Sequence, residues 1–520
     1  MPWVEAYGAH CRGFAFAGER YLTGVELARY IASAVVADDC DLRIATLNGH
    51  FIAIVEHEDK VYLVADKLRT YPLLYAVDDD DFIVADSADE MMRHLKHPAL
   101  NADALPYYLA SGYLYGEDTL VEGCYTLPPA SVAVAENGQV KLHTYYNRLH
   151  AKHHATPDDI VYYRAITDRM VARLRTVAHG RQVVIPLSGG YDSRHVACLC
   201  RRAGLTDVVC YTYGTSGSDE TAVAGRVAHL LGYPIHVMEY TPAMWRTVFD
   251  SGDAQRYMLS SANLNSIAHM YDLAVLYRMH SQGLIRPDAI FMPGHSGDFL
   301  AGTHFTDFVD SRNTVHWIYE NYFNINVMRC ADERKIKRQI AAQIGQFEPI
   351  DTLEASYEAI FQWNLNSRQP YYINNWNRVF EYFGHTWFMP LWDDEYLAFW
   401  SSISCVDRKR SDIYYDYLFS EIFAPLGVDI RKTEKPRKSL PMRFLARYVP
   451  FAPKYRAKLL LEKLGLYHFS PDNSLLNVVA DLIRPLGQYQ GVPLLPCREN
   501  SMSAKTMYYL HHVNKSLKPK

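Results

Sequence analysis

The feature that most constrains the fold of this chain is a short Ser/Gly loop between an apolar run and a helical pattern. The run Gln182–Pro186 (QVVIP) is typical of a buried strand, SGGYDS follows at Ser188–Ser193, and a helix is expected over Ser193–Arg202. A buried strand, a tight polar turn and a helix in immediate succession favour a βαβ unit. The loop therefore predicts an α/β domain.

The loop is also suited to binding phosphate. Gly189 and Gly190 let the backbone turn sharply and approach a ligand, while free N–H groups at a helix start favour an anion. Ser188 and Ser193 add hydroxyl donors, and Asp192 could hold Mg²⁺ against the phosphates. The GxxxxGK[ST] spacing and its lysine are absent, so this is not a Walker A loop. The alternative for SGG alone is a Ser/Gly turn with an Asx cap.

From about residue 155 the chain predicts a parallel sheet followed by a helical region. Helical periodicity over Asp159–Ala178 precedes the loop. Strand patterns at Asp207–Tyr213 and Pro234–Tyr240 then alternate with a helix over Asp219–Leu231, which indicates right-handed βαβ units. A further strand, Ala289–Pro293, leads into GHSGDFLAG, and beyond about residue 310 the pattern is mostly helical.

Residues 1–145 predict a separate antiparallel sheet with a few helices. Arg43–Glu56, Lys60–Ala65 and Pro72–Val77 are apolar or alternating runs separated by turn residues. Ser131–Ala135 and Lys141–Tyr145 flank the AENG turn as a hairpin. With 520 residues the chain is too long for one ordinary core, so we expect two domains, at 1–150 and 155–520.

Motifs in both halves resemble the asparagine synthetases. SGGYDS resembles the pyrophosphate loop of the ATP-pyrophosphatase superfamily, whose members split ATP between its α and β phosphates. GHSGDFLAG at 294–302 is similar to that family's GEGSDExFGG element, SDETAVA at 218–224 to its acidic helix start, and MPLWDDEYLAFW at 389–400 to its PFLD element. LNGHFIAIV and DKLRTYPLLY resemble the class II glutamine amidotransferase domain, and GYLYGEDTLVEGCYTLPPA resembles the connector between the two domains.

The resemblance implies an antiparallel, Ntn-type amidotransferase-like N-terminal domain and a C-terminal domain like the adenine-nucleotide α-hydrolases, with a parallel sheet and a helical C-terminal region. ATP and Mg²⁺ are the cofactors it implies. The nucleotide-binding residues that it implies are Leu187, Ser188, Gly189, Gly190, Asp192, Ser193, Asp219 and Gly294. Asp192 and Asp298 are the implied metal ligands, and Gly302, Pro390 and Asp393 match further family positions.

The synthetase motifs depart from the family pattern at one central position. His295 stands where the family has its catalytic glutamate, and Phe299 replaces an acidic residue. We expect His295 to act as general base toward an incoming amine, because an unperturbed histidine pKa of about 6.5 suits that task. The alternative is a histidine that packs or hydrogen bonds within its loop.

Cations are expected beside the phosphates, because the charge that develops on the leaving pyrophosphate needs one. Lys435 lies four residues before Ser439, which is the spacing of the family's catalytic lysine, and Lys438 is the substitute if the register slips. The alternative for both lysines is a solvated basic loop. Arg194, next to the phosphate loop, is expected either to reach phosphate or to lie on the helix surface.

The N-terminal half lacks the glutaminase signature. Glutaminase activity in this family needs a cysteine directly after the initiator Met, and residue 2 here is Pro. Cys11, the nearest cysteine, has no free α-amine beside it to act as base, so we expect a small buried hydrophobe. The domain is predicted to be a scaffold without glutaminase activity, which leaves an amine or ammonia as the nitrogen source.

Composition limits which partners and which cellular compartment we expect. A net charge of −5 gives no electrostatic case for nucleic acid or a membrane surface, and no stretch of about 18 apolar residues predicts a transmembrane helix. Nine scattered cysteines without a CxxC pair indicate a reduced, cytoplasmic protein. The expected partners are a small-molecule or peptide carboxylate and an amine or ammonia donor, and a homodimer is possible.

Together these features predict a ligase that adenylates a carboxylate, releases pyrophosphate and transfers the acyl group to nitrogen. The PLWD and GHSGD variants favour a sugar-carboxylate amidotransferase of surface-polysaccharide biosynthesis. An intramolecular cyclase that forms a macrolactam, β-lactam or lasso peptide is the alternative, and a non-catalytic nucleotide-binding or regulatory protein is a second one. Substrate specificity is expected to reside in the stretch 303–380.

Overall fold

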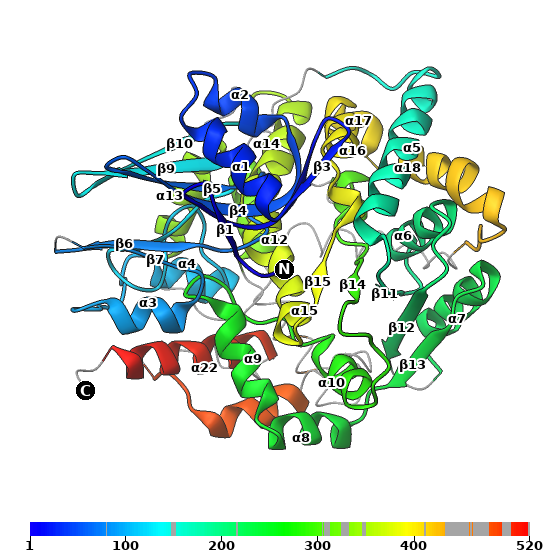
Figure 1. Cartoon of the computed structure of the whole chain (residues 1–520). Coiled ribbons are helices and arrows are strands. Elements are labelled where there is room, and N and C mark those ends of the chain that lie inside the picture. Colours follow the sequence, from blue (N-terminus) through cyan, green and yellow to red (C-terminus); the bar gives the residue numbers. More distant parts are fainter. Residues whose placement is uncertain are drawn as a thin grey trace.

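The fold contains an antiparallel part and a parallel part, which lie on opposite sides of the molecule in Figure 1. The computed structural model describes residues 1–79, 81–146, 152–214, 217–303, 305, 313–323, 332–345, 350–409, 412–431, 457, 460, 478–490 and 501–517. Within those residues a seven-stranded sheet and a three-stranded sheet belong to the N-terminal half, and a five-stranded sheet belongs to the second half. This confirms the predicted fold class.

The N-terminal sheet follows the order β1-β2-β4-β5-β9-β10, with β3 paired to β2, and every pairing is antiparallel. The smaller sheet has the order β7-β6-β8. The elements of this half are β1 Val4–Ala6, β2 Ala9–Ala17, β3 Arg20–Thr23, α1 Val25–Val35, α2 Cys40–Ala45, β4 Leu47–His57, β5 Lys60–Ala65, β6 Leu74–Asp78, β7 Asp81–Ala85, α3 Ala88–His94, α4 Leu105–Ser111, β8 Cys124–Thr126, β9 Ser131–Glu136 and β10 Gln139–Thr144.

Local sequence explains most of these boundaries. Asn137 and Gly138 both have positive φ, as a tight two-residue turn requires, so β9 and β10 pair as the predicted hairpin. The expected strand over 43–56 is partly wrong, because its first residues end α2, where Arg43 bonds the Asp39 carboxylate at 2.6 Å and Ile44 is buried. The strand expected from Pro72 begins at Leu74 instead.

The second half is built on a parallel sheet of order β13-β12-β11-β14-β15. Two βαβ units run from β11 through α6 to β12 and on through α7 to β13, and three further helices carry the chain to β14 on the other side of β11. These elements are α5 Asp159–Ala178, β11 Val183–Pro186, α6 Tyr191–Arg202, β12 Val208–Gly214, α7 Asp219–Leu231, β13 Ile235–Glu239, α8 Pro242–Asp250, α9 Asp253–Ala262, α10 Leu273–Ser281, β14 Ile290–Phe291 and β15 Thr386–Trp387. Because β11 lies at the centre of the sheet, its first three residues are buried, and Pro186 at its end is partly exposed.

Beyond β14 the described chain is helical apart from β15, as the sequence predicts. The bounds are α11 Gly297–Leu300, α12 Thr314–Tyr322, α13 Glu333–Ile344, α14 Leu353–Asn366, η1 Gln369–Ile373, η2 Asn374–Asn377, α15 Arg378–Tyr382, η3 Pro390–Trp392, α16 Asp394–Ser402, α17 Cys405–Arg408, α18 Asp412–Tyr417, η4 Leu418–Phe423, η5 Ala424–Leu426, η6 Arg484–Leu486 and α22 Ser501–Ser516. The C-terminal helix α22 returns to pack on α9, where the Tyr509 hydroxyl accepts the Leu264 N–H at 2.9 Å.

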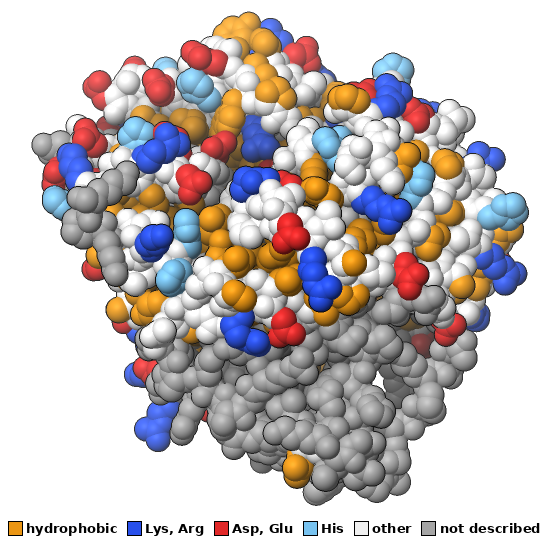
Figure 2. Space-filling model, turned by 90° about the horizontal axis from the view of Figure 1, so that it is seen from below, with side chains coloured by type: hydrophobic (Ala, Val, Ile, Leu, Met, Phe, Trp, Pro, Cys, Tyr) orange, Lys and Arg blue, Asp and Glu red, His pale blue; other side chains and the backbone are white. Residues whose placement is uncertain are grey.

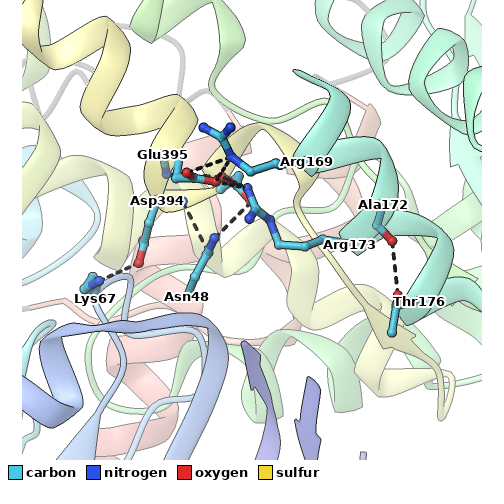
Figure 3. Close-up of polar contacts among 9 residues, drawn as sticks. Asn48, Lys67, Arg169, Ala172, Arg173, Thr176, Asp394 and Glu395 are labelled. Atoms are coloured by element: carbon cyan, nitrogen blue, oxygen red, sulfur yellow. Dashed lines mark hydrogen bonds and ion pairs between the residues drawn. The ribbon is translucent and has the colours of Figure 1, made fainter. Parts of the chain in front are cut away.

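A polar network joins the two halves of the chain (Figure 3). Asp393, the cap of α16, receives both a 2.6 Å and a 2.9 Å bond from the Arg173 guanidinium of α5. Its carboxylate also accepts a 3.0 Å bond from the Asn48 amide of β4, and Lys67 pairs with Asp394. The predicted PFLD-like element therefore contacts the N-terminal sheet directly.

Charges on the surface seen in Figure 2 are mixed in sign. On the described part of that face, Lys and Arg side chains are interspersed with Asp and Glu and do not gather into one patch. No helix among the described residues is both long and apolar enough to cross a membrane.

Candidate active site

A cavity of about 580 Å³ opens at the carboxyl ends of β11, β12 and β14. The phosphate loop lines one part of it, and the loop after β14, Gly294 to Asp298, lines another. The helical stretch 368–380 supplies a third wall. The carboxyl edge of a parallel sheet, where neighbouring connections diverge, is where α/β proteins commonly bind ligands.

The Ser/Gly loop is closed by hydrogen bonds between its own hydroxyls and backbone. Ser193 Oγ lies 3.0 Å from the Ser188 N–H and 3.1 Å from Ser188 Oγ, while the Gly190 N–H donates to Ser188 Oγ at 3.1 Å. The Leu187 N–H bonds the Tyr211 carbonyl at 2.8 Å and so continues the sheet into the loop. Because these bonds fix the turn, the start of α6 faces the cavity in a defined position. Leu187, Ser188, Gly190, Asp192 and Ser193 all line it.

Two glycines are required by close approaches. A Cβ on Gly189 would lie 2.9 Å from Glu220 Cα, at the start of α7. A Cβ on Gly294 would lie 2.4 Å from the Ser193 nitrogen, so the loop after β14 packs directly on the phosphate loop. Gly294 lines the cavity. Gly189 does not line it, but its missing side chain allows the start of α7 to pack against the phosphate loop.

Asp192 and Asp298, the two residues expected to bind the metal, are neighbours in the structure. The Asp298 N–H donates to Asp192 Oδ2 at 2.7 Å, and Gly297 leaves the room for this, because a Cβ there would lie 2.6 Å from Asp192 Oδ1. Both side chains line the cavity. Within the described residues no group of three or more His, Cys, Asp or Glu side chains could hold a metal ion. Two carboxylates fit Mg²⁺, which usually takes one or two from protein and completes its shell with water and phosphate oxygens.

His295 lies in the cavity wall, but its acid–base character differs from the expectation. The ring packs edge-on against Trp376 at 5.3 Å, and Nδ1 is buried with no hydrogen-bond partner among the described residues. Burial lowers the pKa of His295 to about 4, against the smaller opposing effects of Asn377 and Asp298. The side chain is therefore neutral near pH 7 and presents a hydrogen-bond acceptor rather than a base of ordinary strength.

Asp219 and Arg194 lie differently from the sequence expectations. Asp219 is exposed at the first residue of α7, and Glu220 lines the cavity in its place. Arg194 neither reaches the cavity nor lies on the surface: it is fully buried and donates to the carbonyls of Val428 at 3.1 Å and Ile430 at 2.6 Å. Both expectations for Arg194 are therefore wrong. Lys435, Lys438 and Ser439 lie outside the described residues.

Sequence reasoning missed two charged residues of the cavity. Asp272, the cap of α10, accepts a 2.7 Å bond from the Tyr211 hydroxyl, and burial raises the pKa of its carboxyl to about 6. Arg368, just after α14, is the single Lys or Arg among the described residues that line the cavity. Neither residue belongs to a motif, and the broad expectation of specificity in 303–380 is the one signal that pointed toward Arg368.

No cation lowers the pKa of the described cysteines of the N-terminal half. Cys11 is buried in β2 as expected, and burial raises the pKa of its thiol to about 12. Burial likewise raises the pKa of Cys124 to about 12 and that of Cys40 to about 11. A reactive cysteine needs a lowered pKa or an adjacent base, so none of these three is suited to be a nucleophile.

Two proteins of known structure are similar to parts of this chain. An NH3-dependent NAD synthetase from Campylobacter jejuni is 18% identical with a TM-score of 0.21, covering 39% of this chain and 94% of its own. The U34-tRNA thiolase NcsA from Methanococcus maripaludis is 13% identical with a TM-score of 0.24, covering 66% and 88%. Scores this low add nothing to what the sheets themselves establish.

Each half of the chain matches the model of a known domain family. A curated relative, "Amidase chry2" of Gibberella zeae, is 24% identical over 265 residues, which is 46% of this chain but 38% of that protein's length. The glutamine amidotransferase domain model matches residues 35–146. The asparagine synthase model matches residues 163–458, which is more than half of the chain and includes every loop that builds the cavity. The chain therefore belongs to the asparagine synthase family.

Proposed function

We propose that this protein is an ATP-dependent carbon–nitrogen ligase that adenylates a carboxylate and passes the acyl group to an amine or to ammonia. The observation that carries the proposal is the packing of the Gly294–Asp298 loop on the phosphate loop, through Gly294 against Ser193 and Asp298 against Asp192. This contact supports one site in which nucleotide phosphates and a second reactant meet.

The proposed reaction has two steps. A carboxylate oxygen of the acid attacks the α-phosphorus of ATP, the bond from that phosphorus to the bridging oxygen breaks, and pyrophosphate leaves with the electron pair. The amine nitrogen then attacks the acyl carbon, AMP leaves, and the nitrogen loses a proton. When bound by Asp192 and Asp298, Mg²⁺ would supply charge neutralisation for the departing pyrophosphate.

Residues of the chain have defined parts in this scheme. The Ser188–Ser193 loop and the start of α6 bind the phosphates through backbone N–H groups. Neutral His295 accepts a hydrogen bond from the incoming amine and orients it, a role that its place in the cavity wall and its lowered pKa support. The aromatic wall that contains Trp376 and Phe380 keeps water from the activated acyl group. Lys435 remains the proposed cation beside the phosphates.

Nitrogen is proposed to come from outside the chain. Each described cysteine of the N-terminal half is held in its thiol form, and Cys11 faces the core between sheet and helix. A scaffold role for this half is supported by its network with the PLWD element, in which Asn48 and Asp393 take part. As the acid we propose a sugar carboxylate, following the PLWD and GHSGD variants.

The test is pyrophosphate release from Mg²⁺-ATP with a panel of sugar acids and with ammonia or glucosamine as nitrogen donors. Acid-dependent pyrophosphate and AMP, with no dependence on glutamine, are expected. A thermal shift with α,β-methylene-ATP and Mg²⁺ is measured in parallel. Absence of both the shift and pyrophosphate release would contradict the ligase and favour a non-catalytic protein. Glutamine-dependent turnover would contradict the scaffold role of the N-terminal half.

A further inference from the structure

The C-terminal helix α22 carries a lysine into the interior of the protein. Lys505 is 4% exposed, and its Nζ donates to the Ala268 carbonyl at 2.6 Å. No carboxylate among the described residues pairs with it, and burial lowers the pKa of its amine to about 7. An amine removed from water without an opposite charge costs stability, and a methionine would fill the same space at lower cost. The presence of this lysine therefore needs an explanation other than packing.

The same helix holds the segment that leads into the cavity. Residues 263–272 connect α9 with α10 and end at Asp272 in the cavity wall. Near the start of this segment, Leu264 has a left-handed backbone with a φ of 58°, which is costly for a residue with a bulky side chain. The Tyr509 hydroxyl of α22 accepts the Leu264 N–H at 2.9 Å, and Lys505 binds the segment four residues further on. Two side chains of α22 thus fix a strained segment.

Ring contacts connect this segment to His295. His269 follows Ala268 directly and is buried. The centre of its ring lies 4.8 Å from that of Trp376, and His295 packs edge-on against the same indole at 5.3 Å. Because a close-packed interior has few voids, buried rings in contact cannot shift independently. A displacement of the backbone at Ala268 would therefore move Trp376 and, with it, His295.

Helix α22 also contacts the helical stretch 368–380, which forms another wall of the cavity. The Tyr372 hydroxyl donates to Met502 Sδ at 3.5 Å. The Tyr372 ring packs edge-on against His269, with ring centres 4.5 Å apart. Contacts of α22 thus reach two walls of the cavity, although the helix lies beyond the residues that the two family models match.

We infer that Lys505 is a positioning residue for the amide-forming step. It fixes the backbone at Ala268, and the two ring contacts then hold His295 where it meets the amine. This inference rests on the proposed function, in which His295 orients the incoming amine. None of the contacts that carry it includes the phosphate loop, so adenylation should not depend on Lys505.

Separate assays of the two steps test this inference. Acid-dependent ATP–pyrophosphate exchange measures adenylation, and amide formed with ammonium chloride measures transfer, each with glucuronate, galacturonate and glucarate as acids. Lys505→Met should leave exchange within about twofold of wild type but lower amide formation about tenfold to a hundredfold, because a displacement of about 1 Å at a reacting group has effects of this size. The melting temperature should not fall, since the buried amine itself costs stability.

Control variants distinguish the possible failures. Lys515→Met removes an exposed lysine of the same helix and should change neither step. Tyr509→Phe removes the acceptor of the Leu264 N–H and should lower amide formation to a lesser degree while exchange persists, which decides the matter if Lys505→Met does not fold. Absence of exchange in the wild type would overturn the proposed function. Exchange in the wild type, with both steps lowered equally or amide formation unchanged in these two variants, would overturn the inference alone.

Discussion

Buried polar groups at the junction of the two halves have hydrogen-bond partners, whereas two enclosed nitrogen atoms in the cavity wall have none among the described residues. At the junction, Asp393 is almost fully buried and receives bonds from Arg173 and Asn48, and the Asp66 carboxylate nearby accepts three backbone N–H groups. In the cavity, His295 Nδ1 and Arg368 Nε are equally enclosed but have no partner among the described residues.

This difference separates the two sets, although enclosed atoms without a partner also occur outside the cavity, at Arg69 Nε and Arg194 Nε. In the saturated network, the loss of a buried member leaves its charged partner buried and unpaired, which lowers the free energy of unfolding. Enclosed polar atoms without a partner cost stability in the free protein, and proteins retain such a cost chiefly at functional sites. Substitutions at the junction should therefore lower stability, and substitutions in the cavity should lower activity with little effect on folding.

The largest effect is expected at Asp192. Asp192→Asn keeps an oxygen that can accept the Asp298 N–H but removes the negative charge, so the Mg²⁺ and phosphate geometry should fail. We expect pyrophosphate release to fall by about a thousandfold or more, by analogy with the loss of other groups that stabilise transition-state charge. The melting temperature should stay within a few degrees of the wild type. A large fall in melting temperature would contradict the expectation that substitutions in the cavity have little effect on folding.

Substitutions at the junction should lower the free energy of unfolding. Asp393→Ala leaves the Arg173 guanidinium half-enclosed without its main partner, and breaking a buried ion pair costs about 3–5 kcal/mol of unfolding free energy. Urea denaturation measures this loss. Glu395→Ala is the matched control, because Glu395 pairs with the same arginine but is more exposed, so its loss should be small. Equal losses in the two variants would show that burial does not set the value of these pairs.

A smaller and pH-dependent effect is expected at His295. Burial lowers its pKa to about 4, so the neutral ring that accepts the amine persists as the pH falls and is lost only when the pH approaches 4. Pyrophosphate-coupled amide formation should therefore lack an acid limb near pH 6.5 that depends on this residue. His295→Phe, which fills the space but cannot accept a hydrogen bond, should lower the rate about tenfold to a hundredfold. A limb near pH 6.5 that disappears in this variant would contradict the assignment.

The sequence predicted the loops well because their constraints are local. A Cβ on Gly189 or Gly294 would clash with another part of the backbone, and one on Gly297 would clash with the Asp192 side chain, so these requirements are visible in the sequence as glycines. Arg194 shows the limit. Helical spacing places it on α6 but says nothing of the carbonyls at Val428 and Ile430, which are more than two hundred residues away in the chain. Arg368 was missed for the same reason, since the two tyrosine rings that its guanidinium contacts come from separate segments.

The smallest effect is expected for substitution of Cys11, which tests whether a buried thiol of the N-terminal sheet has only a structural role. The thiol is buried in β2 and its pKa is raised, so it behaves as a small apolar group in a packed core. Cys11→Ala should cost about 1 kcal/mol of unfolding free energy and leave acid- and ammonia-dependent turnover unchanged. Cys124→Ala, at an equally buried thiol of the same half, serves as control. If turnover fell in the first variant and not in the second, Cys11 would belong with the unsaturated, functional residues, and the N-terminal half would have a chemical part in supplying nitrogen.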